Sequence, residues 1–267
     1  MKHIHFDPEP NGFYGAYWPY QGADCAVIAM LGDDPEDHMA RSAVKWLLGQ
    51  GVSVLTMSPA KKDYSHHNYP LERVEAAIAW LTAHGNRKVG IDEASTTGTL
   101  ALTAAAYFPA LTLTIAMTAS DFIWQVFVAE GKRTGDRMNS RRLFDDSEAA
   151  HPLREEEMIP VERIQGKLLL VGAEDDVLWD AARYIRRMEK RLSEKPHTCS
   201  VEAAVYAHGT HFVFPEGMLK TMLPVGSALF VKWAFPAARK YPKECRETRR
   251  DIEKRMCRVL AEWKGEE

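Results

Sequence analysis

Short apolar runs recur along the chain, separated by longer stretches in which apolar residues return every three or four positions. Runs of this length that are flanked by turn residues are typical of strands buried on both faces of a parallel sheet. The runs that we predict as strands are Cys25–Leu31, Val52–Met57, Val89–Ile91, Leu111–Met117, Lys167–Val171 and Ser200–Tyr206.

The intervening stretches have the period of amphipathic helices. Between Pro70 and His84, for example, the apolar residues fall on one helical face. We predict helices at about 35–48, 70–84, 98–107 and 179–192, two further C-terminal helices, and an aromatic leading strand or hairpin arm at 12–20. Strands that alternate with helices indicate a mostly parallel sheet with right-handed crossovers and helices on both faces. The predicted fold class is therefore α/β.

The regular alternation stops between residues 119 and 160, where the chain is charged and poorly periodic. A long irregular segment after a strand is typical of a lid or cap insertion. Because the chain has 267 residues, we expect one large domain, 1–267, that carries this insertion.

Composition narrows the functional classes. The chain is 46% apolar and has a net charge of −3, so it has material for a core and no basic surplus that would suggest nucleic acid. The four cysteines lack CxxC spacing and suggest reduced thiols. We find no apolar run of membrane-spanning length, and the sequence MKHIHFDPEP has no signal-peptide core. We therefore expect a cytoplasmic protein with no membrane partner.

A serine stands at the junction of a predicted strand and a predicted helix. Ser95 follows the Val89–Ile91 run and precedes an alanine- and leucine-rich segment. This placement is typical of a nucleophile elbow, whose usual pattern is G-x-S-x-G. The corresponding residues here are Glu93-Ala94-Ser95-Thr96-Thr97, so both glycines are replaced.

Two later strands end in residues that could complete a catalytic triad. The run Gly172-Ala173-Glu174-Asp175-Asp176 follows one strand, and Ala207-His208-Gly209-Thr210-His211 follows the next. Active groups of parallel α/β sheets lie at the carboxyl ends of the strands. The order serine, acid, histidine is that of α/β-hydrolases.

On these residues the sequence resembles the α/β-hydrolase superfamily. Within it, the sequence resembles the C-terminal catalytic domain shared by acyl-CoA thioester hydrolases and bile acid-CoA:amino acid N-acyltransferases, with the dienelactone-hydrolase group as a near neighbour. The segments that carry the resemblance are VGIDEASTTGTLAL, TASDFIWQ, LLLVGAEDDVLW and YAHGTHFVFP.

The resemblance implies Ser95 as nucleophile and His211 as base. It favours Asp175 as the acid from its offset after Gly172, whereas counting back from Trp179 favours Asp176. His208 is interpreted as a structural residue.

An oxyanion hole in such a site needs two N–H donors. We expect one main-chain N–H from Thr96 and the other from Asp33, with Asp34 as the competitor. A charged Glu93 beside the nucleophile would disfavour an oxyanion unless it is protonated or paired. Two interpretations stay open, an altered elbow that works and a site that has lost efficient catalysis.

The expected partner is a small-molecule acyl ester or thioester, cleaved without cofactor or metal. Phe122 and Trp124 could line an acyl pocket or belong to the core. The basic residues Lys132, Arg133, Arg137, Arg141 and Arg142 could face the phosphates of an acyl-CoA or form a solvated surface.

Two alternatives are a carboxylesterase of small esters and a binding protein of the same fold. The paired histidines His66 and His67 have no acidic partner at ligand spacing, so we predict no metal site there. Trp233 and Phe235 could be core residues or the contact of a homodimer.

Overall fold

The computed structural model describes residues 2–58, 69–123, 140–223 and 227–265. Within these ranges the strands are β1 (Ile4–Phe6), β2 (Gly15–Trp18), β3 (Cys25–Ala29), β4 (Ser53–Met57), β5 (Lys88–Ala94), β6 (Leu111–Met117), β7 (Lys167–Ala173) and β8 (Ser200–Tyr206). The α-helices are α1 (Pro8–Asn11), α2 (His38–Leu48), α3 (Leu71–Ala83), α4 (Ser95–Tyr107), α6 (Arg141–Ala150), α7 (Ala181–Glu194), α8 (Glu216–Met222), α9 (Ser227–Ala234), α10 (Pro236–Lys240) and α11 (Pro242–Lys264).

These strands form one twisted sheet in the order β1-β2-β4-β3-β5-β6-β7-β8. Strands β4 to β8 along that order pair in parallel, whereas the hairpin β1–β2 adds an antiparallel edge. The predicted α/β class with a mostly parallel sheet is therefore confirmed. The aromatic leading segment is the second strand of that hairpin.

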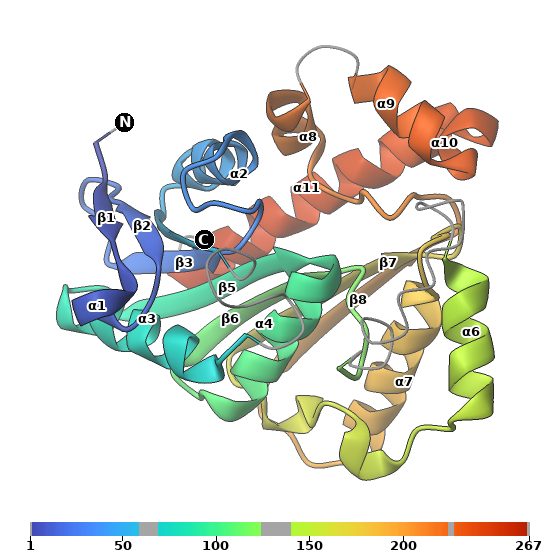
Figure 1. Ribbon diagram of the computed structural model, residues 1–267, viewed down its shortest axis with the longest axis horizontal. Coiled ribbons are helices and arrows are strands. Elements are labelled where there is room, and N and C mark those ends of the chain that lie inside the picture. Colours follow the sequence, from blue (N-terminus) through green and yellow to red (C-terminus); the bar gives the residue numbers. More distant parts are fainter. Residues whose placement is uncertain (1, 59–68, 124–139, 224–226, 266–267) are drawn as a thin grey trace.

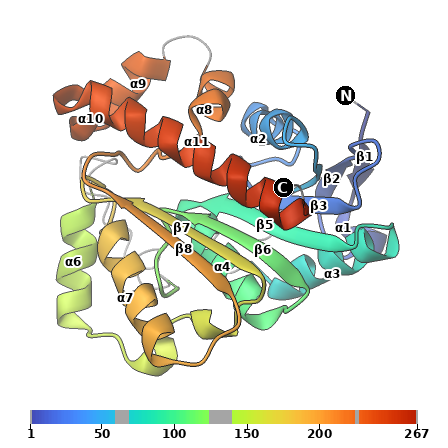
Figure 2. The same cartoon turned by 180° about the vertical axis from the view of Figure 1, so that it is seen from behind.

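Helices cover both faces of the sheet. Helices α3, α4 and α7 lie on one face, and α2 and α11 lie on the other (Figures 1 and 2). Each face has its own apolar cluster, because alternate side chains of a strand point to opposite faces. Because the central strands are parallel, their carboxyl ends lie along the same side of the sheet. The candidate residues follow these strand ends.

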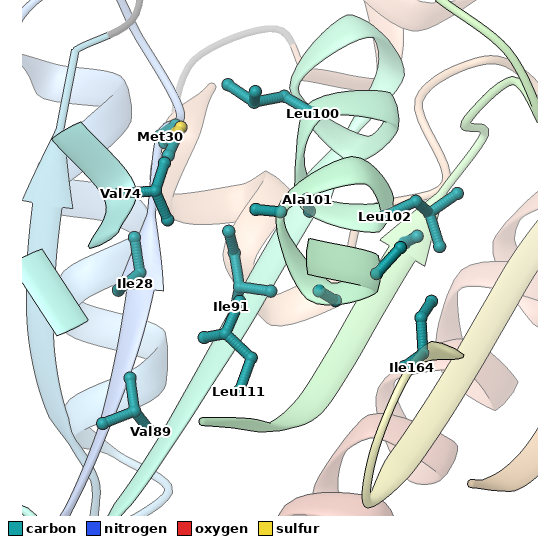
Figure 3. Close-up of a cluster of buried hydrophobic side chains, with 14 of the residues drawn as sticks. Ile28, Met30, Val74, Val89, Ile91, Leu100, Ala101, Leu102, Leu111 and Ile164 are labelled. Carbon is teal, nitrogen blue, oxygen red and sulfur yellow. The ribbon is translucent and has the colours of Figure 1, made fainter. Parts of the chain in front are cut away.

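Helix α4 packs through nearly all of its surface. Its residues from Thr97 to Ala106 are buried, and it lies against β5 and β6. Figure 3 shows Leu100, Ala101 and Leu102 of this helix among Ile91 and other side chains of the α3–α4 face. A helix that is buried on all sides is fixed in place by packing, so its first residue is fixed as well.

Two helix starts differ from prediction. Helix α2 begins at His38 rather than near Pro35, because the carboxylate of Asp37 accepts the Ala40 N–H and caps the helix. Helix α4 begins at Ser95 rather than Gly98, since β5 runs to Ala94 and joins the helix without a loop. The single residue that turns the chain there is Ser95, with φ of 62°.

The described part of the predicted insertion holds the irregular segment 119–123, helix α6 and a short 3₁₀ helix, Glu155–Glu157, and a second 3₁₀ helix, Val161–Arg163, follows it directly. Helix α6 lies beside α7 at one end of the sheet (Figures 1 and 2). A lid within 119–160 stays a prediction, because residues 124–139 lie outside the described part.

None of the described helices combines the length and the apolar character that crossing a bilayer requires.

Matched leucines should show how strongly the buried helix contributes to stability. Leu102 of α4 is fully buried, whereas Leu229 of α9 is 74% exposed. We expect Leu102→Ala to lower the free energy of unfolding by about 2–5 kcal/mol, because it leaves a cavity in a packed core. Leu229→Ala should change it by less than about 0.5 kcal/mol. Urea unfolding followed by circular dichroism measures both values, and equal effects would contradict the packing described.

Candidate active site

Ser95, His211 and Asp176 form a hydrogen-bonded chain at the carboxyl edge of the sheet. His211 Nε2 lies 2.8 Å from Ser95 Oγ, and His211 Nδ1 lies 2.8 Å from Asp176 Oδ2. The three residues follow β5, β8 and β7, which are separate strands of one parallel sheet (Figure 1). Parallel strands deliver their carboxyl ends to the same edge, so residues 116 positions apart in sequence come into contact.

The backbone of Ser95 has the geometry expected of an elbow. Its φ of 62° lies in the left-handed region, which is costly for a residue with a side chain. Such a conformation persists only where the surrounding structure fixes it, and here β5 and the buried α4 hold both sides. The serine is partly exposed, whereas His211 is 3% exposed.

The hydrogen-bond partners of His211 indicate which of its ring nitrogens carries the proton. An ionised carboxylate only accepts hydrogen bonds, so His211 donates its Nδ1–H to Asp176. Nε2 is then free of a proton and can accept the Ser95 O–H. This is the tautomer in which an imidazole can take a proton from a serine hydroxyl.

The acid beside His211 is Asp176, and the preference for Asp175 is corrected. The chain turns directly after β7, and the side chains of these two consecutive residues have different partners. Asp176 is fully buried and also accepts the Leu178 N–H at 2.9 Å, whereas Asp175 is partly exposed and lies 2.9 Å from His208 Nδ1. His208 stacks on Tyr241, with ring centroids 3.8 Å apart, in line with its interpretation as a structural residue.

Glu93, in the place of the first elbow glycine, is buried and connects two strands. Its carboxyl group accepts the N–H of Met30, the residue that follows β3. Burial raises the pKa of Glu93 well above 4.5, and the neighbouring Asp92 raises that pKa further. Burial therefore favours the neutral form of Glu93, which is the form that places no negative charge beside Ser95.

The second replaced glycine is accommodated in a simpler way. The hydroxyl group of Thr97 donates to the carbonyl of Ala94 at 2.7 Å, so this buried polar group is satisfied. The close approach falls one residue later, at Gly98. A Cβ there would lie 3.2 Å from both the Ala119 Cβ and the Met117 carbonyl oxygen.

Of the expected oxyanion donors, the structure is compatible with Thr96 but not with Asp33 or Asp34. Thr96 is the second residue of α4, at the end of a helix where main-chain N–H groups lie outside the helical ladder. Asp33 is not supported, since its N–H donates to Asp37 at 2.9 Å, and the competitor Asp34 donates to the same oxygen at 3.2 Å. Asp37 draws both N–H groups into the cap of α2.

Two contacts of His211 could not be read from the sequence. The ring of Trp179 meets the imidazole edge-on, with centroids 5.0 Å apart, and its Nε1–H donates to the Thr118 carbonyl at 2.8 Å. Thr118 itself has φ of 47°, and its hydroxyl group lies 3.4 Å from the His211 carbonyl oxygen. A threonine in the left-handed region carries no sequence signal, because nothing in its residue type favours that backbone.

The predicted pocket residues are only partly described. Phe122 is buried in a cluster with Trp179 and Tyr184, and it also borders a cavity of about 580 Å³ beside α6. Trp124 lies outside the described residues, as do His66 and His67. Among the residues that the structure describes, no cluster of His, Cys, Asp or Glu could hold a metal ion.

The family model "BAAT / Acyl-CoA thioester hydrolase C terminal" matches residues 69–218, more than half of the chain. These residues include all three members of the hydrogen-bonded chain.

Solved structures with the same fold include esterase Pf2001 of Pyrococcus furiosus, with 14% identity over 99% of this chain and 93% of that chain and a TM-score of 0.59. The deep-sea metagenome α/β hydrolase MGS-M1 has 13% identity over 99% and 98% of the two chains and a TM-score of 0.58. Est1E of Butyrivibrio proteoclasticus has 12% identity over 98% and 100% and a TM-score of 0.50. At such identities these structures establish a common fold.

Asp92, beside Glu93, should give the protein a measurable pH dependence. Burial raises its pKa from 3.8 to about 7, and its Oδ1 has no hydrogen-bond partner among the described residues. The folded protein therefore holds this proton more tightly than the unfolded chain. The contribution of Asp92 to stability is then full below about pH 4 and is lost as the pH rises toward 7.

Replacing Asp92 with Asn should remove this component. We expect the free energy of unfolding of the wild type, relative to Asp92→Asn, to fall steadily between about pH 4 and 7. Urea titrations at several pH values in this range measure the difference. A difference that stays constant, or that grows with pH, would show that Asp92 is ionised in the folded protein.

Proposed function

This chain belongs to the BAAT / acyl-CoA thioester hydrolase C-terminal family, and from that premise we propose that it hydrolyses acyl thioesters with Ser95 as nucleophile. Membership places the chain among hydrolases of ester bonds. The observation that carries the finer proposal is the continuous hydrogen-bonded chain from Ser95 through His211 to Asp176.

The proposed reaction has two steps. His211 Nε2 takes the proton of Ser95 as the serine oxygen bonds to the acyl carbon, and the resulting imidazolium returns that proton to the departing thiolate or alkoxide. Water then attacks the acyl-enzyme in the same way, releasing the carboxylic acid and free Ser95. Asp176 stabilises the imidazolium in both steps and keeps Nε2 facing the serine.

The altered elbow supports a working site better than a decayed one. Its left-handed serine, its hydrogen-bonded Thr97 and the raised pKa of Glu93 are each compatible with an oxyanion beside Ser95. Backbone strain such as that at Ser95 persists only where the surroundings maintain it, and it is concentrated at functional sites. Strain at the residue that contacts a buried His–Asp pair therefore favours catalysis over binding alone.

Hydrolysis is favoured over acyl transfer. A serine nucleophile in place of the cysteine of the N-acyltransferase branch favours water as the acceptor. Thioesters are favoured over oxygen esters by the family alone. Of the basic residues that could face the phosphates of an acyl-CoA, Arg141 and Arg142 are both paired with carboxylates, and Lys132, Arg133 and Arg137 lie outside the described residues.

A carboxylesterase of small esters is therefore the second candidate. It is favoured by the two paired arginines and by structural neighbours such as Pf2001 that are esterases. Comparing turnover of acyl-CoAs of several chain lengths with turnover of 4-nitrophenyl esters separates the two candidates. Cleavage of esters alone selects the carboxylesterase.

Ser95→Ala should abolish turnover of every acyl substrate that the wild type cleaves. Loss of the nucleophile leaves only the rate supplied by binding and oxyanion contacts, so we expect kcat to fall by at least about 10³-fold. A fluorophosphonate probe should label the wild type and leave Ser95→Ala unlabelled. Equal labelling of the two proteins, or full activity of the variant, would sink the proposal.

The two neighbouring aspartates provide a matched pair for testing the acid. Asp176→Asn should lower kcat by about 10⁴-fold, because an asparagine favours the wrong tautomer of the histidine. Asp175→Asn, which loses only the contact with His208, should retain kcat within roughly threefold, as expected for a partly exposed site. Steady-state kinetics at pH 7 distinguish them, and the reverse order of effects would return the role to Asp175.

A further inference from the structure

The segment that carries Asp176 has little regular structure of its own. Residues 174–180 connect β7 to α7, and within this loop the Asp176 N–H donates to the Ala173 carbonyl at 3.3 Å and the Leu178 N–H donates to Asp176 Oδ1. We name residues 174–180 the acid loop. The carbonyl groups of residues 174 and 176–178 take no part in these bonds, and buried carbonyl groups need donors.

Those donors come from the start of helix α6. The guanidinium group of Arg141 donates from one nitrogen to the carbonyl oxygens of Glu174, at 2.7 Å, and Asp176, at 3.2 Å. The main-chain N–H of Arg141 donates to the Val177 carbonyl at 2.9 Å.

The adjacent Ser140 hydroxyl group donates to the Leu178 carbonyl at 2.8 Å. Four carbonyl groups of the acid loop are thus bound by two consecutive residues of another element.

An ion pair completes the attachment. The second terminal nitrogen of Arg141 binds the carboxylate of Asp180, and the other oxygen of Asp180 caps α7 by accepting the Arg183 N–H at 3.0 Å. A guanidinium group has a rigid, planar set of donors that is always charged. Its two terminal nitrogens bind two carbonyls and one carboxylate at once, whereas the three donors of a lysine ammonium all radiate from a single nitrogen.

We propose that Arg141 is a positioning residue for the triad acid: through the acid loop it holds the Asp176 carboxylate against His211. This inference rests on the proposed function, in which Asp176 acts on His211. It assigns the start of α6, within the segment predicted as a lid insertion, to the catalytic machinery. The arginine does not touch the substrate, and it acts by fixing the loop.

Arg142 provides the matched control. It is the next residue of the same helix, its side chain is 93% exposed, and its ion pair is with Asp146 four residues on. Removing its side chain leaves the acid loop unchanged. The comparison therefore holds residue type, helix and loss of charge constant.

In Arg141→Ala we expect kcat to fall roughly 10–100-fold with KM changed less than about threefold, because misplacement of a catalytic group by an ångström costs this much in rate. The acid limb of the kcat/KM profile should also move to lower pH. A displaced Asp176 stabilises the imidazolium less, so His211 would lose its proton at lower pH. Arg142→Ala should match the wild type in all three quantities, and Arg141→Lys should lie between.

A readout independent of turnover is the low-field proton resonance of the His211 Nδ1–H in the wild type. It should weaken or shift upfield in Arg141→Ala and stay unchanged in Arg142→Ala. Circular dichroism and the fluorophosphonate probe count the folded, active fraction, so that partial unfolding is not mistaken for the effect. If Arg141→Ala does not fold, Arg141→Lys decides by the same measurements.

The inference would be overturned if folded Arg141→Ala kept the kcat, the acid limb of the kcat/KM profile and the His211 Nδ1–H resonance of the wild type. A fall in kcat with an unmoved pH limb and resonance would also overturn it, since a merely structural loss behaves that way. Failure of the proposed function looks different, because then either the wild type would cleave no acyl substrate or Ser95→Ala would remain active, whatever the arginine does.

Discussion

The direct junction of β5 and α4 at Ser95 is the constraint on which the rest of the site depends. One residue turns a buried strand into a buried helix, and it can do so only with φ near 60°. The energetic cost of that backbone is met by packing: α4 lies against β5 and β6, and Gly98 allows it to approach Ala119 closely. Because β5 and α4 are both fixed, the position of the Ser95 hydroxyl group is fixed as well. His211 and Asp176 must be brought to that position by their own loops.

Glu93, two residues before the junction, meets this constraint with a side chain where a glycine is usual. Glycines at an elbow usually solve a steric problem, whereas Glu93 turns the same position into a connection between β5 and the end of β3. Such a carboxyl group can be buried only if it is neutral or paired, and its raised pKa favours the neutral form. The junction is therefore held by a hydrogen bond between β5 and the residue after β3, and burial disfavours a negative charge on Glu93 beside Ser95.

The acid and the base sit on loops, which are less constrained than strands, and each loop is braced from outside. Thr118 contacts the histidine loop through its hydroxyl group and holds Trp179 through its carbonyl group. The acid loop is held by Ser140 and Arg141. These braces come from segments that follow β6, so the region after that strand supports both the His211 loop and the acid loop. Arginine serves this purpose because one planar group reaches several acceptors.

The sequence by itself predicted the parallel strands and the helices between them, the α/β class, and the serine and histidine that the structure brings into contact. These follow from local features, namely apolar periodicity and the residues that stand directly after each strand. Tertiary structure decided what depends on the direction of side chains.

Asp175 and Asp176 are adjacent and alike, and only the path of the loop turns Asp176 inward toward His211 and Asp175 outward toward His208. The sequence predicts the N–H of Asp33 as an oxyanion donor, but in the folded chain this N–H donates to Asp37, the residue that caps α2. The charge on Glu93 and the role of Arg141 depend on burial and on partners far away in sequence, which residue types and spacing do not encode.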